Sequence, residues 1–384
     1  MIYLDNGATS FPKPKEMIAA MKECMAKYCG NPGRSGHAMS LRTGEEVYHA
    51  RRKVAGLFGI KNGERLVFTK NTTEALNMGL KGFLKKGDHA ITTSMEHNSV
   101  LRPLKALERY GVQHSIVRAD RLGMVNPCDI EKAIQSNTKL IVVTAASNVT
   151  GSKMPLEEIS LIAKKRGVAL MVDGAQGAGM MDLDVERLNI SMLAVPGHKG
   201  LLGPLGTGAL YAAPWVNLTP IMEGGTGTES KSRLQPREFP EGFEAGTVNA
   251  PAIIGLGVSA EFVGKIGPDV IGRYEEDLIT CLDENLMNME FVKLYGPSPS
   301  EKTGISLITI DGLEAEEVTA LLNNDYQIAV RGGYHCAGLA HKTIGTWDTG
   351  AVRISVGPYN TKSDIYTLID AISVSYTHLR AHET

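Results

Sequence analysis

The sequence predicts an α/β protein, with a large domain built on a mostly parallel seven-stranded sheet and a smaller α+β domain at the C-terminal end. Between residues 60 and 215, short runs that are apolar throughout alternate with helix-like segments. This alternation is typical of a parallel sheet that is covered on both faces. The chain has 384 residues, more than one hydrophobic core usually organises, so two domains are expected.

Seven strands are expected in the first part of the chain. They are Arg65–Thr69, His89–Thr93, His114–Val117, Leu140–Ala145, Val168–Val172, Met192–Val195 and Gly208–Ala212. Helices are expected between them at Thr73–Phe83, Asn98–Tyr110 and Leu156–Arg166. The last of these follows Pro155, and proline suits the start of a helix. Ligands of such sheets bind beyond the carboxyl ends of the strands, so functional residues are expected there.

The composition changes at residues 222–247 to a stretch rich in Gly, Glu and Ser, which we interpret as a long functional loop. The later pattern predicts helices at Pro251–Lys265, Arg273–Met289, Ala315–Asn323 and Ser363–Ala371, and strands at Ile305–Ile310, Gln327–Val330 and Val352–Val356. We assign the large domain to residues 13–250, and the small domain to residues 251–373 together with residues 1–12. Residues 374–384 resemble a translated sequencing-library adapter, so we expect a non-native tail.

Charge and composition argue against several classes of protein. The 40 Lys and Arg residues nearly balance the 42 Asp and Glu residues, so we expect neither nucleic acid nor an anionic membrane as a partner. No apolar run approaches the roughly 18–20 residues of a membrane span. The five cysteines are scattered, without a CxxC pair; we therefore expect no disulfide framework, no metal site and a reducing compartment. The N-terminus lacks a leader pattern, so a cytoplasmic location is expected.

Two strand ends carry residues that suit catalysis. The strand Val168–Val172 is followed by Asp173 and then by Gln176, and a carboxylate at the tip of a buried strand needs a cationic or hydrogen-bonding partner. A helix-capping role is the alternative. Beyond Met192–Val195, Lys199 stands close to glycines. Desolvation would lower the pKa of its amine and favour a Schiff-base nucleophile; the alternative is a surface lysine in a loop.

A third strand end supplies small hydroxyl residues. The strand Arg65–Thr69 leads into Thr72 and Thr73 at the start of a helix. Such residues cap helices, which is the more frequent case, but the free N–H groups at that end also bind phosphate. A lysine for an imine, a carboxylate for a ring nitrogen and a helix N-terminus for a phosphate are together what pyridoxal phosphate requires.

Longer blocks resemble a known family. They are YLDNGATSFPKP, NPGRSGHAMS, FTKNTTEALN, SMEHNSVLRPL, SNVTG, MVDGAQGAG, PGHKGLLGPLGTGALY, FEAGTVNAP and RISVGPYNT. In these blocks the chain resembles the class V aminotransferases of fold type I, and specifically the cysteine desulfurase and selenocysteine lyase branch. The resemblance implies the PLP-dependent transferase fold, pyridoxal 5'-phosphate as the cofactor and a homodimer.

The resemblance also implies roles for the residues around the cofactor. Lys199 would be joined to it as an imine and would move protons, while His97 would stack on its ring and assist proton transfer. Asp173 would pair with the ring nitrogen and Gln176 with the ring hydroxyl, and Asn148 would lie near the ring and the substrate.

The phosphate of the cofactor would be bound by Thr72, Thr73 and His198, and by Thr247 of the other subunit. Related enzymes often have Ser where this chain has Pro196. Proline has neither a hydroxyl nor an N–H to donate, so one of the family's phosphate contacts is not expected here.

The segment RGGYHCAG, residues 331–338, indicates the reaction. Its spacing resembles the block in which desulfurases of the second group carry their nucleophile. The resemblance therefore implies that Cys336 takes sulfur from L-cysteine, leaving L-alanine and an enzyme persulfide. Arg331 and His335 would lower the pKa of its thiol. The alternatives are an inert buried thiol, a selenocysteine lyase, another class V aminotransferase or β-lyase, and a sulfur carrier without turnover.

Two features bear on the substrate and the sulfur acceptor. Arg353 lies in a strand-like run, and the resemblance implies that it binds the substrate carboxylate, with Arg331 and Asn148 nearby; a surface salt bridge is the alternative. The 16 residues from Ala337 to Val352 form a short connection, and in the family that the chain resembles, a short connection implies transfer of the persulfide to a docked sulfur-acceptor protein. The segment HKTIGTW, residues 341–347, differs from the proline-rich continuation of the best-known relatives and leaves the acceptor and substrate preference open.

Overall fold

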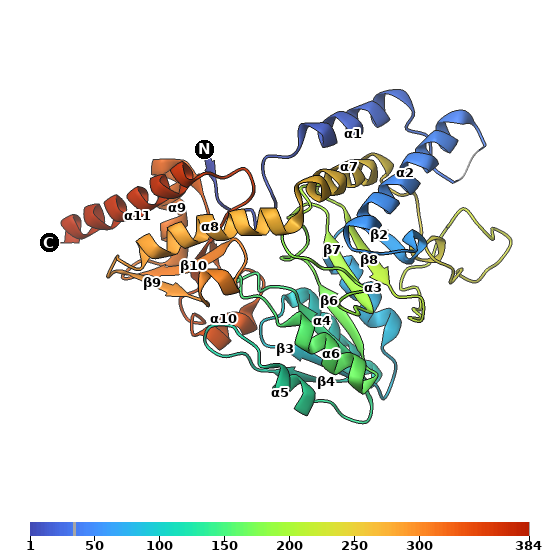
Figure 1. Cartoon of the computed structure of the whole chain (residues 1–384), viewed down its shortest axis with the longest axis horizontal. Coiled ribbons are helices and arrows are strands. Elements are labelled where there is room, and N and C mark those ends of the chain that lie inside the picture. The colour runs from blue at the N-terminus through green and yellow to red at the C-terminus, as the bar shows by residue number, and fades with distance from the viewer. Residues whose placement is uncertain (34–35, 384) are drawn as a thin grey trace.

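The computed structural model describes residues 1–33 and 36–383, with side chains as far as Val374. Two main sheets organise this part of the chain (Figure 1). The large sheet has seven strands in the order β2-β8-β7-β6-β5-β3-β4, and the small sheet has four in the order β12-β13-β10-β9. A further pair, β1 and β11, runs parallel. These sheets confirm the predicted fold class.

The large sheet contains every strand predicted for the first part of the chain, with ends that differ by at most two residues. Its members are β2 (Leu66–Thr69), β3 (His89–Thr93), β4 (Gln113–Val117), β5 (Thr138–Thr144), β6 (Ala169–Asp173), β7 (Met192–Pro196) and β8 (Gly208–Ala212). Only β8 runs antiparallel to its neighbours, and the other pairings are parallel. All residues of β6, β7 and β8 are buried, as expected of strands covered on both faces.

Helices lie between and beside the strands of the large sheet in the order of the chain. They are α1 (Lys15–Lys27), α2 (Ala38–Leu57), α3 (Thr72–Phe83), α4 (Asn98–Leu107), α5 (Pro127–Lys132), α6 (Leu156–Arg166) and α7 (Ala250–Ile266). The segments of α1, α2 and α5 had no predicted helix. The apolar α7 packs against α1 and α2. A Cβ at Gly257 would lie 2.5 Å from Cα of Ala50, so the close approach of α7 to α2 requires glycine there.

The second part of the chain contains the small sheet and its helices. These elements are α8 (Pro268–Leu286), β9 (Val292–Tyr295), β10 (Ile305–Ile310), α9 (Ala315–Tyr326), β11 (Ile328–Ala329), β12 (Arg331–Gly333), α10 (Gly338–Ile344), β13 (Ala351–Ser355) and α11 (Lys362–Glu383). Short 3-10 turns lie at Gly63–Arg65, Glu108–Tyr110, Glu241–Phe243 and Pro299–Glu301. The helix predicted from Arg273 begins five residues earlier, at Pro268, where proline occupies the first turn.

Each main sheet has its own hydrophobic core. The larger core is built on residues such as Val142, Leu170 and Leu193, and the smaller one on residues such as Leu278 and Ile354. The N-terminal strand β1 (Ile2–Tyr3) pairs with β11, which places the start of the chain beside the small sheet. The domain boundaries at residues 13–250 and 251–373 stay predictions.

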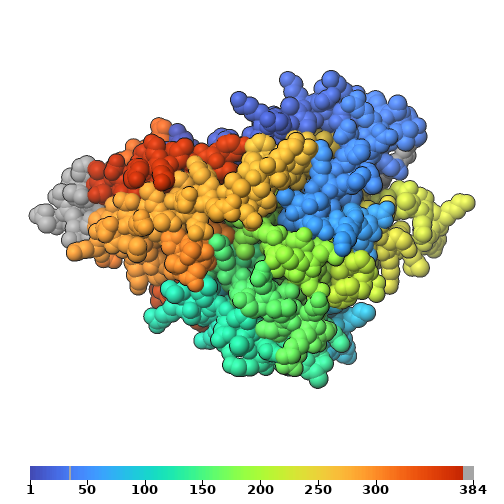
Figure 2. All heavy atoms as spheres, viewed as in Figure 1, coloured from blue at the N-terminus to red at the C-terminus, as the bar shows by residue number. Residues whose placement is uncertain are grey.

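Two segments bear on the remaining predictions. Residues 222–247 contain only one short 3-10 turn, protrude in yellow at the edge of the molecule (Figure 2) and form the long loop that the composition predicts. The backbone of α11 runs to Glu383, past the predicted end at Ala371. Side chains beyond Val374 lie outside the described residues, so the non-native tail stays a prediction.

By length and apolarity, no individual helix in the described part of the chain qualifies as a membrane span. Taken together, α7 and α8 would meet these two criteria, but they are bent by 75° at the residue between them.

Candidate active site

One pocket brings together most of the residues that the sequence singles out. It lies at the carboxyl ends of β6 and β7 and at the starts of α3 and α4. Its lining includes Thr72, Thr73, His97, Ser99, Asn148, Asp173, Gln176, His198 and Lys199. This is the edge of the sheet at which the strand pattern predicted a site.

Lys199 follows β7 and is only partly exposed. Burial, followed by the positive charge of Arg353, lowers the pKa of its amine to about 8, while Asp173 acts in the opposite direction. The turn around it is tight, because a Cβ at Gly200 would lie 2.2 Å from the carbonyl oxygen of Ala178. A substantial fraction of the amine is therefore neutral near physiological pH and able to act as a nucleophile or base.

Asp173 is the last residue of β6, and only 2% of it is exposed. Its Oδ1 accepts a hydrogen bond from the N–H of Ala175 at 3.0 Å. Burial raises the pKa of this carboxyl to about 6, against the opposing effects of that N–H and of Lys199. Its one bond to a near neighbour resembles a capping contact, but the side chain also lines the pocket. Gln176 lies beside it, and its Nε2 donates to the carbonyl oxygen of Gly7 at 2.9 Å.

The start of α3 presents hydroxyl groups to the pocket. The capping side chain is Asn71, whose oxygen accepts from the N–H of Glu74 at 2.9 Å, so Thr72 is not used as the cap. Oγ1 of Thr72 and Nδ1 of His198 are buried without a hydrogen-bond partner among the described residues. Buried polar atoms are costly to leave unpaired, and these two line the same pocket. They fit an anionic ligand such as a phosphate.

His97 caps α4 and is oriented by Ser99. Its Nδ1 accepts from the N–H of Ser99 at 3.0 Å and lies 2.9 Å from the Ser99 hydroxyl. That hydroxyl is also 2.8 Å from the hydroxyl of Thr73. Burial and the nearby charge of Lys199 lower the pKa of His97 to about 4, so its imidazole is neutral and carries its hydrogen on Nε2. Sequence reasoning missed Ser99, although its place two residues after His97 at a helix start is a usable signal.

Arg353 lies on β13, directly opposite Arg331 of β12, and is 1% exposed. Its Nη1 donates to the carbonyl oxygen of Asn148 at 3.0 Å, and its Nη2 donates to Oδ1 of Asp5 at 2.9 Å. Its Nε is buried without a partner in the described part of the chain. The surface salt bridge considered as an alternative is therefore wrong. Asp5 is a further residue that sequence reasoning missed.

Cys336 is exposed and lies beside the pocket rather than in its lining. The carbonyl oxygen of the preceding His335 accepts from Nδ2 of Asn148 at 2.7 Å, and the carbonyl oxygen of Cys336 accepts from the N–H of Asn98 at 2.9 Å. Asn148 lines the pocket, and Asn98 follows His97. Hydrogen bonds to the carbonyl oxygens of His335 and Cys336 therefore fix the Cys336 segment to the pocket rim, and the alternative of a buried thiol is wrong.

The His335 side chain behaves differently from the expectation. It is buried, and burial together with the charge of Arg353 lowers the pKa of its imidazole to about 3. Its ring nitrogens lie 3.1 Å from Nε2 of His341 and 3.1 Å from the carbonyl oxygen of Arg331. His335 is therefore uncharged at neutral pH and adds no positive charge beside Cys336.

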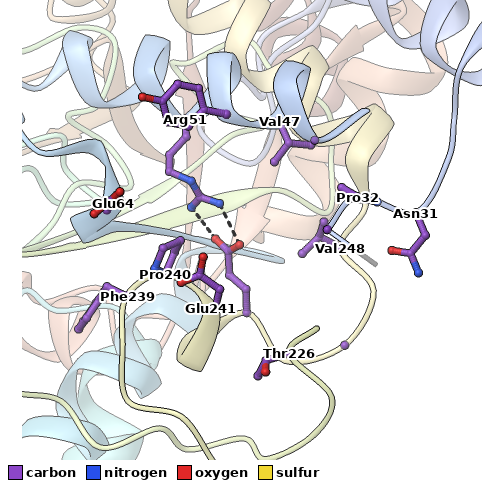
Figure 3. A pocket seen from close by; sticks show the side chains of 15 residues that line it. Asn31, Pro32, Val47, Arg51, Glu64, Thr226, Phe239, Pro240, Glu241 and Val248 are labelled. Atoms are coloured by element: carbon purple, nitrogen blue, oxygen red, sulfur yellow. Dashed lines mark hydrogen bonds and ion pairs between the residues drawn. The ribbon is translucent and has the colours of Figure 1, made fainter. Parts of the chain in front are cut away.

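Thr247 is exposed and is not part of the Lys199 pocket. Its neighbours Gly246 and Val248 line a second pocket, between α2 and the protruding loop (Figure 3). At the base of that pocket, Arg51 and Glu244 form two parallel hydrogen bonds of 2.6 and 2.9 Å. The lining contains no lysine, cysteine or histidine among the described residues.

Comparison with known proteins identifies the family. The model of the family "Aminotransferase class-V" matches residues 2–368. The chain belongs to the class-V aminotransferases. It is similar to a probable cysteine desulfurase of Methanothermobacter thermautotrophicus, at 37% identity over 96% of this chain and 92% of that protein. It is also similar to a probable cysteine desulfurase of Pyrococcus abyssi, at 34% identity over 100% of this chain and 96% of that protein.

Solved structures agree with this assignment. A cysteine desulfurase from Thermococcus onnurineus NA1 superposes with a TM-score of 0.91 at 36% identity, covering 97% of this chain and 93% of that one. The cysteine desulfurase CsdA from Escherichia coli gives a TM-score of 0.88 at 29% identity, covering 98% and 94%. These matches confirm the family that the sequence blocks indicated, and they do not favour the selenocysteine lyase alternative.

The pocket of this class-V aminotransferase fits pyridoxal phosphate, the cofactor that the family implies. The fit rests on the buried, unpaired atoms of Thr72 and His198, on the amine of Lys199 and on the buried carboxyl of Asp173. The fit includes no metal: in the described part of the chain, no three His, Cys, Asp or Glu side chains gather as a metal site requires.

Proposed function

We propose that this class-V aminotransferase is a pyridoxal-phosphate-dependent cysteine desulfurase, which converts L-cysteine to L-alanine and holds the sulfur as a persulfide on Cys336. One observation carries the proposal. An exposed cysteine lies at the rim of the Lys199 pocket, where the side-chain amide of Asn148 donates to the carbonyl oxygen of His335 and the N–H of Asn98 donates to that of Cys336. A fold with the lysine pocket alone suits many reactions of amino acids, whereas a cysteine beside it suits sulfur transfer.

The pocket residues have complementary roles toward the cofactor. We assign Lys199 to its aldehyde carbon, Asp173 to its ring nitrogen and Gln176 to its ring hydroxyl. His97 would lie against the ring. When bound, pyridoxal phosphate supplies an electron sink for the carbon atoms of the substrate. Asp173 favours a protonated ring nitrogen because it is a buried carboxylate with one N–H donor, so a cationic partner would satisfy it.

The phosphate would occupy the side of the pocket at the start of α3. Thr72 and Thr73 offer hydroxyl groups there, and His198 offers Nδ1. We also propose a homodimer, in which Thr247 reaches the phosphate bound by the partner. The exposure of Thr247 and its absence from the lining of the Lys199 pocket in its own chain support this role.

The substrate would be oriented through its carboxylate. Arg353 donates to Asn148 and Asp5, which holds the guanidinium in place, and its Nε–H is free for a ligand. Arg331, its neighbour across the strand pair, supplies a second positive charge. The neutral amine of Lys199 then removes the α-proton, which its lowered pKa of about 8 allows. The neutral imidazole of His97 suits hydrogen bonding through Nε2.

Cys336 would complete the reaction. Its thiolate attacks the sulfur of the substrate, so that an S–S bond forms while the C–S bond breaks. The electron pair of the broken bond stays with the substrate carbon, which takes a proton and becomes the methyl group of alanine. The sulfur remains as a persulfide on Cys336, from which a sulfur-acceptor protein or a reductant would remove it.

Product analysis tests this function. The purified protein, loaded with pyridoxal phosphate, is expected to form alanine and, with a thiol reductant, sulfide from L-cysteine. Cys336→Ala is expected to lose sulfide release, whereas Cys128→Ser, at another exposed cysteine, is expected to keep it. Formation of a keto acid instead of alanine, or equal sulfide release from Cys336→Ala, would contradict the proposal. Selenide release from selenocysteine without sulfide release from cysteine would favour the lyase reading.

A further inference from the structure

The segment around Cys336 contains a chain of three buried polar side chains. His335, His341 and Thr346 are at most 3% exposed. His335 Nδ1 is 3.1 Å from His341 Nε2, and His341 Nδ1 is 2.8 Å from the hydroxyl of Thr346. At the other end, His335 Nε2 is 3.1 Å from the carbonyl oxygen of Arg331. Two of the three residues belong to HKTIGTW, the segment that differs from the best-known relatives and that the proposed reaction does not use.

The direction of each hydrogen bond in this chain follows from its ends. A carbonyl oxygen only accepts, so His335 Nε2 carries a hydrogen. Both rings are uncharged at neutral pH, because burial lowers the pKa of His335 to about 3 and that of His341 to about 4. Each ring therefore has one N–H. His335 Nδ1 must accept from His341 Nε2, and His341 Nδ1 must accept from the Thr346 hydroxyl. The carbonyl oxygen of Arg331 thus sets the tautomers of both rings, and the Thr346 hydroxyl is the donor that satisfies the last ring nitrogen.

The backbone at the end of this chain is unusual. The φ angles of His335 and Cys336 are 52° and 57°, in the left-handed region that residues with a Cβ rarely adopt. Such residues persist only where the surroundings hold them, and they gather at functional sites. The two carbonyl oxygens of this turn are held by Asn148 and Asn98. On the other side, the imidazole of His335 is held by the chain that ends at Thr346.

We propose that His341 and Thr346 are positioning residues, which hold Cys336 in the backbone conformation from which its thiol reaches a substrate in the Lys199 pocket. Neither residue touches the reacting atoms; both act through His335. The identity of the reaction rests on the proposed function, but the conformation of the turn can be tested without turnover. A reacting group displaced by about 1 Å can lose up to about a hundredfold in rate, so a loosened turn should slow sulfur transfer.

The test compares three variants of the full-length, cofactor-loaded protein. Thr346→Val keeps the shape of the side chain but removes its hydroxyl, so His341 Nδ1 loses its donor. If His341 then changes tautomer, two acceptor nitrogens face each other and the bond to His335 is lost. Thr346→Ser keeps the hydroxyl. Thr343→Val is the matched control, because Thr343 lies three residues before Thr346, on α10, and its hydroxyl donates only to the carbonyl oxygen of Leu339 in the described structure.

Three measurements separate positioning from general damage. Hydrogen–deuterium exchange of peptides covering residues 334–346 reports the turn itself. The kcat and KM for alanine formation from L-cysteine report sulfur transfer. Exchange of the α-proton of L-alanine in D2O reports proton removal by Lys199, a step that does not need Cys336.

We expect Thr346→Val to exchange its 334–346 amides faster and to lower kcat about tenfold or more. Its KM and its rate of α-proton exchange should stay near those of the unmodified protein. Thr346→Ser should restore both protection and kcat, and Thr343→Val should change neither. Unchanged protection and kcat in Thr346→Val would overturn the proposal, as would a parallel fall in kcat and α-proton exchange. If even the unmodified protein exchanges no α-proton, the proposed function fails, while the amide exchange still decides the conformational part.

Substitution of His341 gives a second test. His341→Leu removes the donor to His335 and should lower kcat at least as much as Thr346→Val does. His341→Gln, whose amide can donate to His335 Nδ1, should recover part of the loss. Equal activity of the Leu and Gln variants would contradict a role for the hydrogen bond. Because His341 is fully buried, the comparison is made on variants whose α-proton exchange matches that of the unmodified protein.

Discussion

The two proposed nucleophiles, Lys199 and Cys336, lie in contrasting surroundings. Lys199 follows a strand of the large sheet, in a pocket with a buried carboxyl and unpaired polar atoms, and burial lowers the pKa of its amine. Cys336 belongs to the segment between two strands of the small sheet and is exposed. Its backbone has a positive φ and is fixed by hydrogen bonds from Asn148, Asn98 and the His335 chain.

The contrast indicates two ways to prepare a reactive group. A buried amine becomes reactive when its surroundings disfavour its charge. The thiol of Cys336 is exposed, so burial does little to its reactivity. Hydrogen bonds to the backbone around it fix its position instead. The first effect should depend on charge and pH, and the second on backbone hydrogen bonds.

Substitution of either nucleophile should give the largest loss of activity. The two substitutions should affect different steps, which distinguishes the role of the Lys199 region from that of the Cys336 region. Lys199→Ala is expected to abolish both α-proton exchange of L-alanine and alanine formation from L-cysteine, because the base is lost. Cys336→Ala is expected to abolish sulfide release but to keep α-proton exchange. The two activities are measured by deuterium incorporation in D2O and by sulfide assay. Loss of exchange in Cys336→Ala would remove the distinction between the two regions.

The pH dependence of cofactor uptake tests the effect of burial on Lys199. Only a neutral amine combines with an aldehyde, and the pKa of Lys199 is lowered to about 8. The rate at which cofactor-free protein binds pyridoxal phosphate should therefore rise about tenfold per pH unit below pH 8 and level off above it. The growth of the imine absorbance measures this rate.

Substitution of Arg353 makes the same test more specific, because the charge of Arg353 is the second cause of the lowered pKa of Lys199. Arg353→Gln should move the midpoint to higher pH, since the repulsion is lost, whereas Arg353→Lys should leave it nearly unchanged. A midpoint near 10 in the unmodified protein would show that burial does not activate this amine.

The buried carboxyl of Glu275, on α8, tests the contact between the Lys199 region and the small-sheet region. It is 2% exposed, its Oε2 has no partner among the described residues, and it lies beside a pocket that also contains Lys199. Burial raises its pKa to about 8. The folded state therefore keeps a proton between about pH 4.5 and 8 that the unfolded state has lost, so this group lowers stability progressively as pH rises through that window.

Glu275→Gln should remove that penalty. Relative to the unmodified protein, the variant should gain about 1 kcal/mol of unfolding free energy per pH unit between pH 5 and 8, a rate set by proton linkage. Urea unfolding at several pH values measures the difference. If the difference in unfolding free energy between the two proteins stays constant from pH 5 to 8, Glu275 does not titrate in this range.

Ser99 should give the smallest effect. Ser99→Ala removes hydrogen bonds to His97 and Thr73, which are worth about 1 kcal/mol in total. Binding of pyridoxal phosphate should weaken by about fivefold, as measured by absorbance titration. Ser160→Ala, at a buried serine of α6 outside the pocket, serves as the control and should leave the affinity unchanged. An effect of Ser160→Ala equal to that of Ser99→Ala would contradict a role for Ser99 in the pocket.

The sequence predicted the large sheet better than the small one. Apolar runs such as Met192–Val195 and Gly208–Ala212 coincide with strands, because burial on both faces leaves a continuous signal. The strand β12 (Arg331–Gly333) was missed because one arginine and two glycines give no such signal. The antiparallel direction of β8 likewise cannot be read from its residues.

The same reasoning applies to the pocket. Residues that follow strands, such as Asp173 and Lys199, could be found from the chain alone. Asp5 could not, because its bond to Arg353 joins residues 348 positions apart. The role of Thr346 was also hidden, since threonine in a short loop has no distinctive pattern until its contact with His341 is seen.

The first ten residues of the chain have a consequence for synthesis. Gly7 accepts a hydrogen bond from Gln176, the N–H of Ser10 donates to the carbonyl oxygen of His198, and Asp5 bonds to Arg353. During translation, these early residues emerge long before their last partner exists. A chain that ends before residue 353 lacks the partner of Asp5, so an incomplete chain should have no working cleft.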